Sequence, residues 1–202
     1  ATNGAGTSLG VNSQHLYFQT IENGTRNLCG ASKTVTLSFW ARSSITNKRI
    51  SVSLFQNYGT GGSPSPQEVI FGIPVTLTSS WTKYVYTFTT NTLVGKTFGT
   101  NNDDYLNVMF FLEWGTSFGN SNVQAGVSAE TYVGSGNIDL AQVQICGGGV
   151  ALPFQPKSYE EELRQCQRYY ERLEDNLGAS PSDAIAAILR VINFSASAQT
   201  VL

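Results

Sequence analysis

The chain contains 202 residues, of which 41% are hydrophobic and 13% are charged, and its formal net charge is -2. This apolar content supports one folded core, while the 20 glycines, the single methionine and the many hydroxyl and amide side chains favour a β-rich scaffold over a helical bundle. The 12 Lys and Arg residues are dispersed, which argues against nucleic-acid binding, and the apolar runs fall far short of the roughly 20 residues needed for membrane insertion.

Alternating apolar and polar side chains predict strands along the first three quarters of the chain. In residues 34–42 the odd-numbered side chains are apolar, and in 50–55 and 106–113 the even-numbered ones are. Each strand thus has one face turned to a core. Further strands are expected at 75–77, 84–88 and 138–145, separated by long Gly-rich loops. The pattern predicts an antiparallel β-sandwich over residues 1–150.

A charged C-terminal segment follows the predicted sandwich, with ten charged residues in 157–175. Ser158 and Glu161 have the spacing of a capping box, which predicts a helix over about 158–175. A second short helix after Pro181 and the start of a further element complete residues 151–202. The first helix has one apolar stripe, formed by Tyr159, Leu163, Cys166, Tyr170 and Leu173. The stripe either packs on the chain's own sandwich or forms a seam between subunits.

The three cysteines, Cys29, Cys146 and Cys166, are an odd number without CxxC spacing. This argues against a zinc site and against a disulfide framework. We expect free and mostly buried thiols, with a Cys29–Cys146 bridge as the alternative.

The sequence offers little for catalysis. His15 is the only histidine, so any triad or Cys-His pair would depend on it alone. Asp103 and Asp104 with Glu113 are candidate carboxylates for glycoside hydrolysis. The two aspartates follow two asparagines, however, which favours a turn or an oxygen site for a hard cation. We therefore expect no enzyme.

A binding site for sugars pairs an exposed aromatic ring with polar neighbours, because sugars have apolar faces and hydroxyl edges. Several such residues fall on the non-core sides of the predicted strands or in the adjoining loops. The candidate contacts are Trp40, Arg42, Phe55, Tyr58, Glu113 and Trp114. The alternative is that Trp40, Phe55 and Phe111 fill a second packing layer or a subunit contact. Trp81, at a strand entry, is expected in the core.

Many segments in register resemble one family of proteins. They are 17–22 (YFQTIE), 33–42 (KTVTLSFWAR), 53–65 (SLFQNYGTGGSPS), 81–84 (WTKY), 101–106 (NNDDYL), 111–115 (FLEWG), 138–144 (IDLAQVQ), and Pro153-Phe154 running into 159–170 (YEEELRQCQRYY). Over residues 8–172 the chain resembles the jelly-roll modules of bacteriophage tail fibres and other virion receptor-binding proteins. The last of these runs is the most diagnostic.

The resemblance implies a galactose-binding-like jelly roll, similar to carbohydrate-binding modules, that attaches a virion to a host surface polysaccharide without catalysis. It also implies a homotrimer, other virion tail proteins as partners and location in the phage tail. Related chains usually begin with a strand ahead of residue 1 of this sequence. They often hold a structural calcium through an acid on the last strand, which Asp139 matches. No other cofactor is implied. A structural virion segment without a ligand site and a glycan-degrading enzyme are the alternatives.

Overall fold

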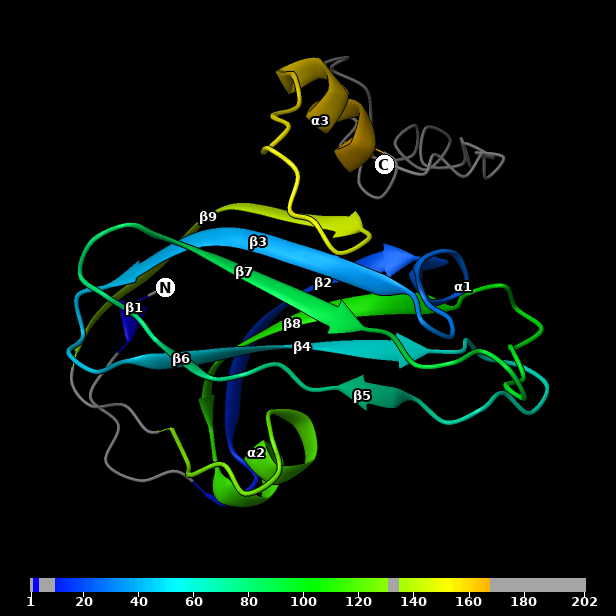
Figure 1. The fold of residues 1–202 in the computed structure, drawn as a ribbon, viewed down its shortest axis with the longest axis horizontal. Helices are drawn as coiled ribbons and strands as arrows, with labels where there is room; N and C mark the ends of the chain where they lie inside the picture. Colours follow the sequence, from blue (N-terminus) through cyan, green and yellow to red (C-terminus); the bar gives the residue numbers. More distant parts are fainter. Residues whose placement is uncertain (1, 4–9, 131–134, 168–202) are drawn as a thin grey trace, which may run out of the picture. The chain divides into compact units, whose positions relative to one another are not determined.

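A computed structural model describes residues 2–3, 10–130 and 135–167 (Figure 1). The chain divides into two units, Ala1–Phe154 and Gln155–Leu202, where the sequence places the boundary at residue 150. The first unit is an antiparallel β-sandwich, and the second contains the described helix α3. The fold class expected from the sequence, mainly β with a helical segment toward the C-terminus, is confirmed.

Two antiparallel sheets form the sandwich. The four-stranded sheet has the order β1 (Thr2–Asn3), β9 (Gly136–Gly147), β3 (Thr34–Ser43), β7 (Thr82–Thr89). The five-stranded sheet has the order β2 (Gln14–Glu22), β8 (Tyr105–Trp114), β4 (Arg49–Asn57), β5 (Glu68–Ile70), with β6 (Val75–Thr76) also paired to β4. Strands β1 to β4 alternate between the sheets, as do β7 to β9, which is the connectivity of a jelly roll.

The core lies between the sheets and is formed by the faces that alternation predicts. Phe39 of β3 stacks on Tyr84 of β7, with ring centroids 5.6 Å apart, and meets Phe110 of β8 edge-on at 5.1 Å. The apolar sides of β3, β4 and β8 are buried in one cluster. This confirms the core faces of the three strands read from the sequence.

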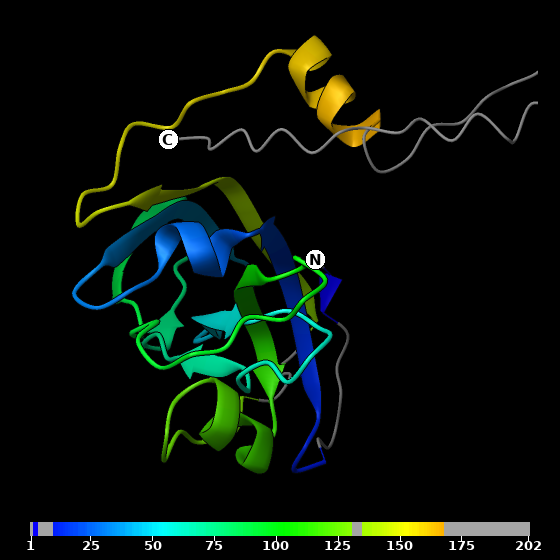
Figure 2. The same ribbon diagram turned by 90° about the vertical axis from the view of Figure 1, so that its right-hand side faces the viewer.

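Two short helices accompany the strands of the first unit. Helix α1 (Gly24–Leu28) connects β2 to β3, and α2 (Thr116–Asn122) follows β8. Figure 2 shows α2 on the side of the five-stranded sheet that faces away from β3 and β7. A second hydrophobic cluster lies there, made of Phe55, Phe111, Trp114 and Val123. The five-stranded sheet is therefore covered on both faces over part of its area.

The thiols of Cys29 and Cys146 are both free and buried. The alternative of a bridge between them is wrong, since Cys29 belongs to the core whereas Cys146 pairs with Thr36 on the outward side of β3. Burial raises the pKa of the Cys29 thiol to about 12, so this thiol stays protonated at neutral pH.

Helix α3 (Tyr159–Gln167) begins as the capping box predicts, because the Glu161 N–H donates to Ser158 Oγ at 3.2 Å. Tyr159, Leu163 and Cys166 are exposed on it. Tyr170, Leu173 and the predicted second helix lie outside the described residues. Among the described helices, none combines the length and the hydropathy that a membrane span requires.

Candidate functional site

Two tryptophans and two cations share the outward face of the four-stranded sheet. Trp40 of β3 pairs in register with Lys83 of β7, and Arg42, two residues further along β3, lies against Trp81, which directly precedes β7. Each tryptophan thus has a cation beside it. Trp81 is 42% exposed. We call this group, together with Asp139 of β9, the Trp–Arg platform.

Arg42 is held in place from two sides. Its Nε donates to Asp139 Oδ2 at 2.8 Å across β3 and β9. Its guanidinium carbon lies 4.8 Å from the centroid of the Trp81 ring, within the range of a cation–π contact. Both partners of the ion pair are partly exposed, so the contacts orient the guanidinium more than they stabilise the fold.

The segment that follows β9 covers the part of this face around Thr36 and does not cover Trp81. Thr36 and Ser38 also point outward, yet both are buried. Thr36 Oγ1 donates to the Gly148 carbonyl at 2.8 Å, and Gln144 Nε2 donates to the carbonyls of residues 152 and 153 at 3.1 Å each. The returning segment therefore closes the face at Thr36 and leaves it open at Trp40.

A β-bulge adjoins the platform. The register of β3 with β9 shifts between Ser38 and Trp40, and Gln142 of β9 has a φ of 50°. This left-handed conformation is unfavourable for a residue other than glycine, and such outliers concentrate at functional sites. The bulge places the small Ala141 opposite Trp40, whose side chain is half-buried.

The six predicted contacts do not form one patch, because β3 and β4 belong to different sheets. Trp40 and Arg42 lie on the platform, whereas Phe55 and Glu113 lie on the opposite outer face of the sandwich and are 7% and 2% exposed. Phe55 packs on Phe111, whose ring in turn contacts Phe118 of α2. The alternative of a second packing layer is correct for this side.

Trp114 is fully buried in this second layer. Its Nε1 donates to the Ser128 carbonyl at 3.0 Å. At Gly119 of α2 a Cβ atom would lie 2.6 Å from Trp114 Cδ1, so only glycine permits this close approach. Trp114 therefore anchors the segment after β8, and its buried ring offers no exposed surface to a ligand.

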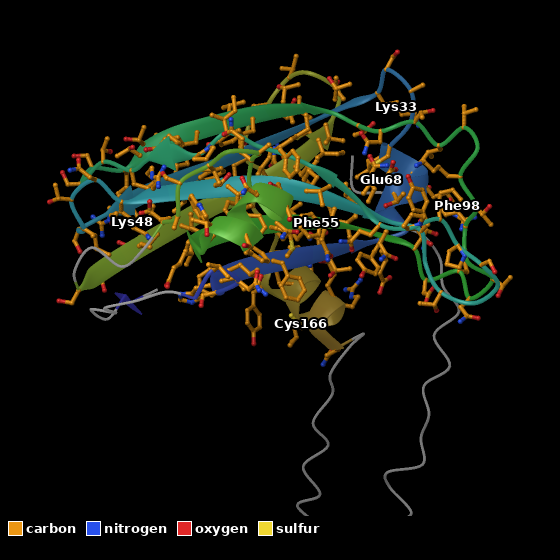
Figure 3. The ribbon with its side chains drawn as sticks, turned by 90° about the horizontal axis from the view of Figure 1, so that it is seen from below. Lys33, Lys48, Phe55, Glu68, Phe98 and Cys166 are labelled. Carbon is orange, nitrogen blue, oxygen red and sulfur yellow. The ribbon has the colours of Figure 1, made fainter. Side chains whose placement is uncertain are left out.

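A buried ion network holds the same segment. Glu130 accepts from Lys48 Nζ at 3.2 Å, from Arg49 Nε at 2.6 Å and from the Arg49 N–H at 3.1 Å. Lys48 is fully buried, and this burial lowers its pKa despite the opposing effect of Glu130. Figure 3 shows Lys48 near one end of the sandwich. Glu113, close enough to influence Lys48, belongs to this structural cluster.

Tyr58 is also structural, being 1% exposed. Its hydroxyl donates to Glu68 Oε2, and Lys96 Nζ contacts Glu68 Oε1 at 2.6 Å. Burial, followed by the contact with Glu68, raises the pKa of Tyr58. Glu68 lies near Phe98 at the end of the sandwich away from Lys48 (Figure 3). Tyr58 thus closes this end and offers no surface to a sugar.

The neighbouring aspartates fasten loops. Asp104 is 2% exposed and pairs with Arg26, its Oδ1 lying 2.9 Å from Nη2. Asp103 accepts from the N–H and hydroxyl of Thr60, and a Cβ at Gly59, where φ is 86°, would lie 2.7 Å from Asp103 Oδ1. The predicted turn is the better interpretation, since both carboxylates are engaged.

The carboxylate of Asp139, the residue matched to a calcium ligand, is paired with Arg42 in this structure. This carboxylate faces the Arg42 guanidinium, which opposes a second cation at that oxygen. In the described part of the chain no group of three or more His, Cys, Asp or Glu residues gathers as a metal site would require. Calcium therefore stays a prediction of the sequence resemblance.

A groove of about 480 Å³, which the sequence did not predict, lies between strands β2 and β9 at one edge of the sandwich. It is lined by Tyr17, Phe18, Gln19, Phe110, Ile138, Leu140 and Val143. Exposed Tyr17 and Phe18 of the edge strand β2 form part of it. With Gln19 as its only side chain carrying an amide, the groove offers fewer hydrogen bonds to a sugar than the platform does.

Part of the chain matches a protein-family model. Residues 30–105 match the family model described as a carbohydrate binding domain. This segment runs from the end of α1 to the start of β8 and includes four members of the platform, namely Trp40, Arg42, Trp81 and Lys83. A search of curated proteins found no match to this chain.

Two solved structures resemble the chain. One, titled "CBM4 structure and function", is 20% identical with a TM-score of 0.36, and the match covers 65% of this chain and 60% of the other. The N-terminal cellulose-binding domain of Cellulomonas fimi β-1,4-glucanase C is 21% identical with a TM-score of 0.37, and the match covers 62% and 66%. The chain spans about three fifths to two thirds of these structures.

Proposed function

We propose that this chain binds carbohydrate, without catalysing a reaction, through the Trp–Arg platform. The observation that carries the proposal is Trp81, exposed and in contact with an Arg42 side chain that Asp139 fixes. A sugar ring stacks its apolar face on such an indole while the guanidinium and the carboxylate bond its hydroxyl edges. The match of residues 30–105 to a carbohydrate binding domain supports the same function.

We further propose that the chain is a receptor-binding component of a bacteriophage tail fibre, located in the virion, that recognises a host surface polysaccharide. The sequence resemblance over residues 8–172 supports this role. A homotrimer and contacts with other virion tail proteins belong to the same proposal. The exposed stripe of Tyr159, Leu163 and Cys166 on α3 supports the seam between subunits.

Glycan binding is tested by screening the chain against host envelope polysaccharides and then titrating the ligand found into variants. Trp81→Ala should weaken binding at least about tenfold while lowering the free energy of unfolding by less than about 1 kcal/mol. Phe18→Ala removes an aromatic ring that is 61% exposed on β2 and serves as the matched control. Equal loss in both variants, or none in Trp81→Ala, would contradict the platform as the binding site.

The trimer is tested by light scattering. Leu163→Asp should convert a trimer to a monomer, and a wild-type chain that is monomeric at all concentrations would argue against the seam. A trimer that binds no polysaccharide would favour the structural virion segment. Turnover of a polysaccharide that disappears in Glu113→Gln would favour the enzyme, although Glu113 is buried beside Lys48.

A further inference from the structure

The platform has many hydrogen-bond donors and few acceptors. The donors are the side chains of Arg42 and Lys83 and two indole N–H groups. The acceptors come from the Asp139 carboxylate, and one of its oxygens, Oδ2, already accepts from Arg42 Nε at 2.8 Å. A ligand group that only accepts hydrogen bonds complements this surface better than a hydroxyl, which must also donate.

The charges of this face favour the same kind of group. Along the described outward positions of β3, β7 and β9 the charged residues are Arg42, Lys83 and Asp139, so that two cations accompany one anion. The whole chain, in contrast, carries a net charge of -2. Lys83 is exposed, and no ion pair of the described residues includes it. The local excess of positive charge is therefore available to a ligand.

The geometry places these cations around the aromatic surface. Lys83 lies beside Trp40 across the β3–β7 pair, and Arg42 lies against Trp81. Because Asp139 binds Arg42 through Nε, the terminal Nη groups remain to form the paired N–H bonds that match the two oxygens of a carboxylate. A sugar ring stacked on either tryptophan has a cation next to it.

We propose that the glycan recognised by the platform carries carboxylate groups, so that the site selects acidic polysaccharides built from uronic acids over neutral ones. This inference rests on the proposed function and names its ligand class. The carboxylate would accept from Arg42 or Lys83 while the sugar ring stacks on Trp40 or Trp81.

Calorimetric titration of the full chain tests the inference with polygalacturonate, alginate and hyaluronan, each compared with its carboxyl-reduced form. At least one acidic polymer should bind about tenfold tighter than its reduced form. Lys83→Gln should weaken binding of the acidic polymer by about threefold to tenfold and weaken binding of the reduced form by a clearly smaller factor. Lys33→Gln removes the same charge from the far end of β3 and should change neither.

The other possible outcomes distinguish a failure of the acid selectivity from a failure of carbohydrate binding itself. Equal binding of acidic and reduced polymers, with loss in Trp81→Ala, would overturn the acid selectivity and leave carbohydrate binding in place. Equal weakening by Lys33→Gln and Lys83→Gln would show attraction by overall charge and would also overturn the inference. Failure to bind any acidic or neutral polymer, in these pairs and in the envelope-polysaccharide screen, would contradict both this inference and the proposed function.

Discussion

Both outer faces of the sandwich carry aromatic residues that point away from the core, but these residues are covered on one face and partly exposed on the other. On the five-stranded sheet Phe55 and Phe111 are covered by α2 and the segment up to Glu130. On the four-stranded sheet the segment after β9 covers Thr36 and Ser38 and leaves Trp81 exposed. Strand alternation thus shows which side chains point away from the core, but the connections between strands decide which of them reach solvent.

The largest expected effect of this difference is on stability. Trp114→Ala should lower the free energy of unfolding by about 3–5 kcal/mol, because it empties a buried site in the second cluster. Trp81→Ala should lower it by less than about 1 kcal/mol, since the ring is partly exposed. Urea denaturation of the two variants measures both values. Similar losses would mean that the two faces do not differ as described.

The second largest expected effect on stability comes from breaking the buried ion network of Lys48, Arg49 and Glu130. Glu130→Gln leaves Lys48 buried without its carboxylate and should lower the free energy of unfolding by about 3 kcal/mol. Glu68→Gln removes a carboxylate that is 26% exposed and paired with Lys96, so its loss should be about 1 kcal/mol or less. Equal losses in urea denaturation would show that burial of the Lys48–Glu130 pair has no energetic consequence.

On the platform the expected effect is on binding and not on folding. Arg42→Lys keeps the charge but loses the planar contact with Trp81 and the geometry of the Asp139 pair. Glycan affinity should fall about threefold to tenfold while the urea midpoint stays unchanged. An affinity equal to that of the wild type would mean that only the charge at this position matters.

The smallest expected effect is a pH dependence at Asp103. Hydrogen bonds from the hydroxyl and then from the N–H of Thr60 hold the pKa of Asp103 below its ordinary value of 3.8. When the pKa of a carboxyl is lower in the folded state than in the unfolded state, its ionised form stabilises the fold at any pH above the unfolded-state pKa. This stabilisation is lost as the pH falls through the folded-state pKa. Melting temperatures between about pH 5 and pH 2 should therefore fall less in Asp103→Asn than in the wild type. Parallel curves would contradict this.

The core faces of β3, β4 and β8 could be predicted from the sequence because each strand keeps a strict period of two over several residues. The start of α3 could be predicted because a capping box is a local signal. Strand β2 was not among the strands read from alternation: its side chains are mostly exposed on an edge strand, so no apolar face is imposed on its sequence.

The candidate site could be predicted only in part. Trp40 and Arg42 were correctly placed on a common outward face. Phe55 was assigned to the same face because it also points away from the core. Strands β3 and β4 belong to different sheets, however, so their outward sides lie on opposite faces of the sandwich. The expectation that Trp81 is core was wrong, since its ring is 42% exposed and lies against Arg42.

The central claim, that glycans bind on the face with Trp40 and Trp81, is tested most directly by following the three tryptophan indole N–H signals by NMR while an oligosaccharide of the bound polymer is added. We predict that the signals of Trp40 and Trp81 shift with saturation while that of Trp114, which donates to the Ser128 carbonyl, stays in place. A shift of the Trp114 signal, with those of Trp40 and Trp81 unchanged, would place the ligand on the other face and contradict the account.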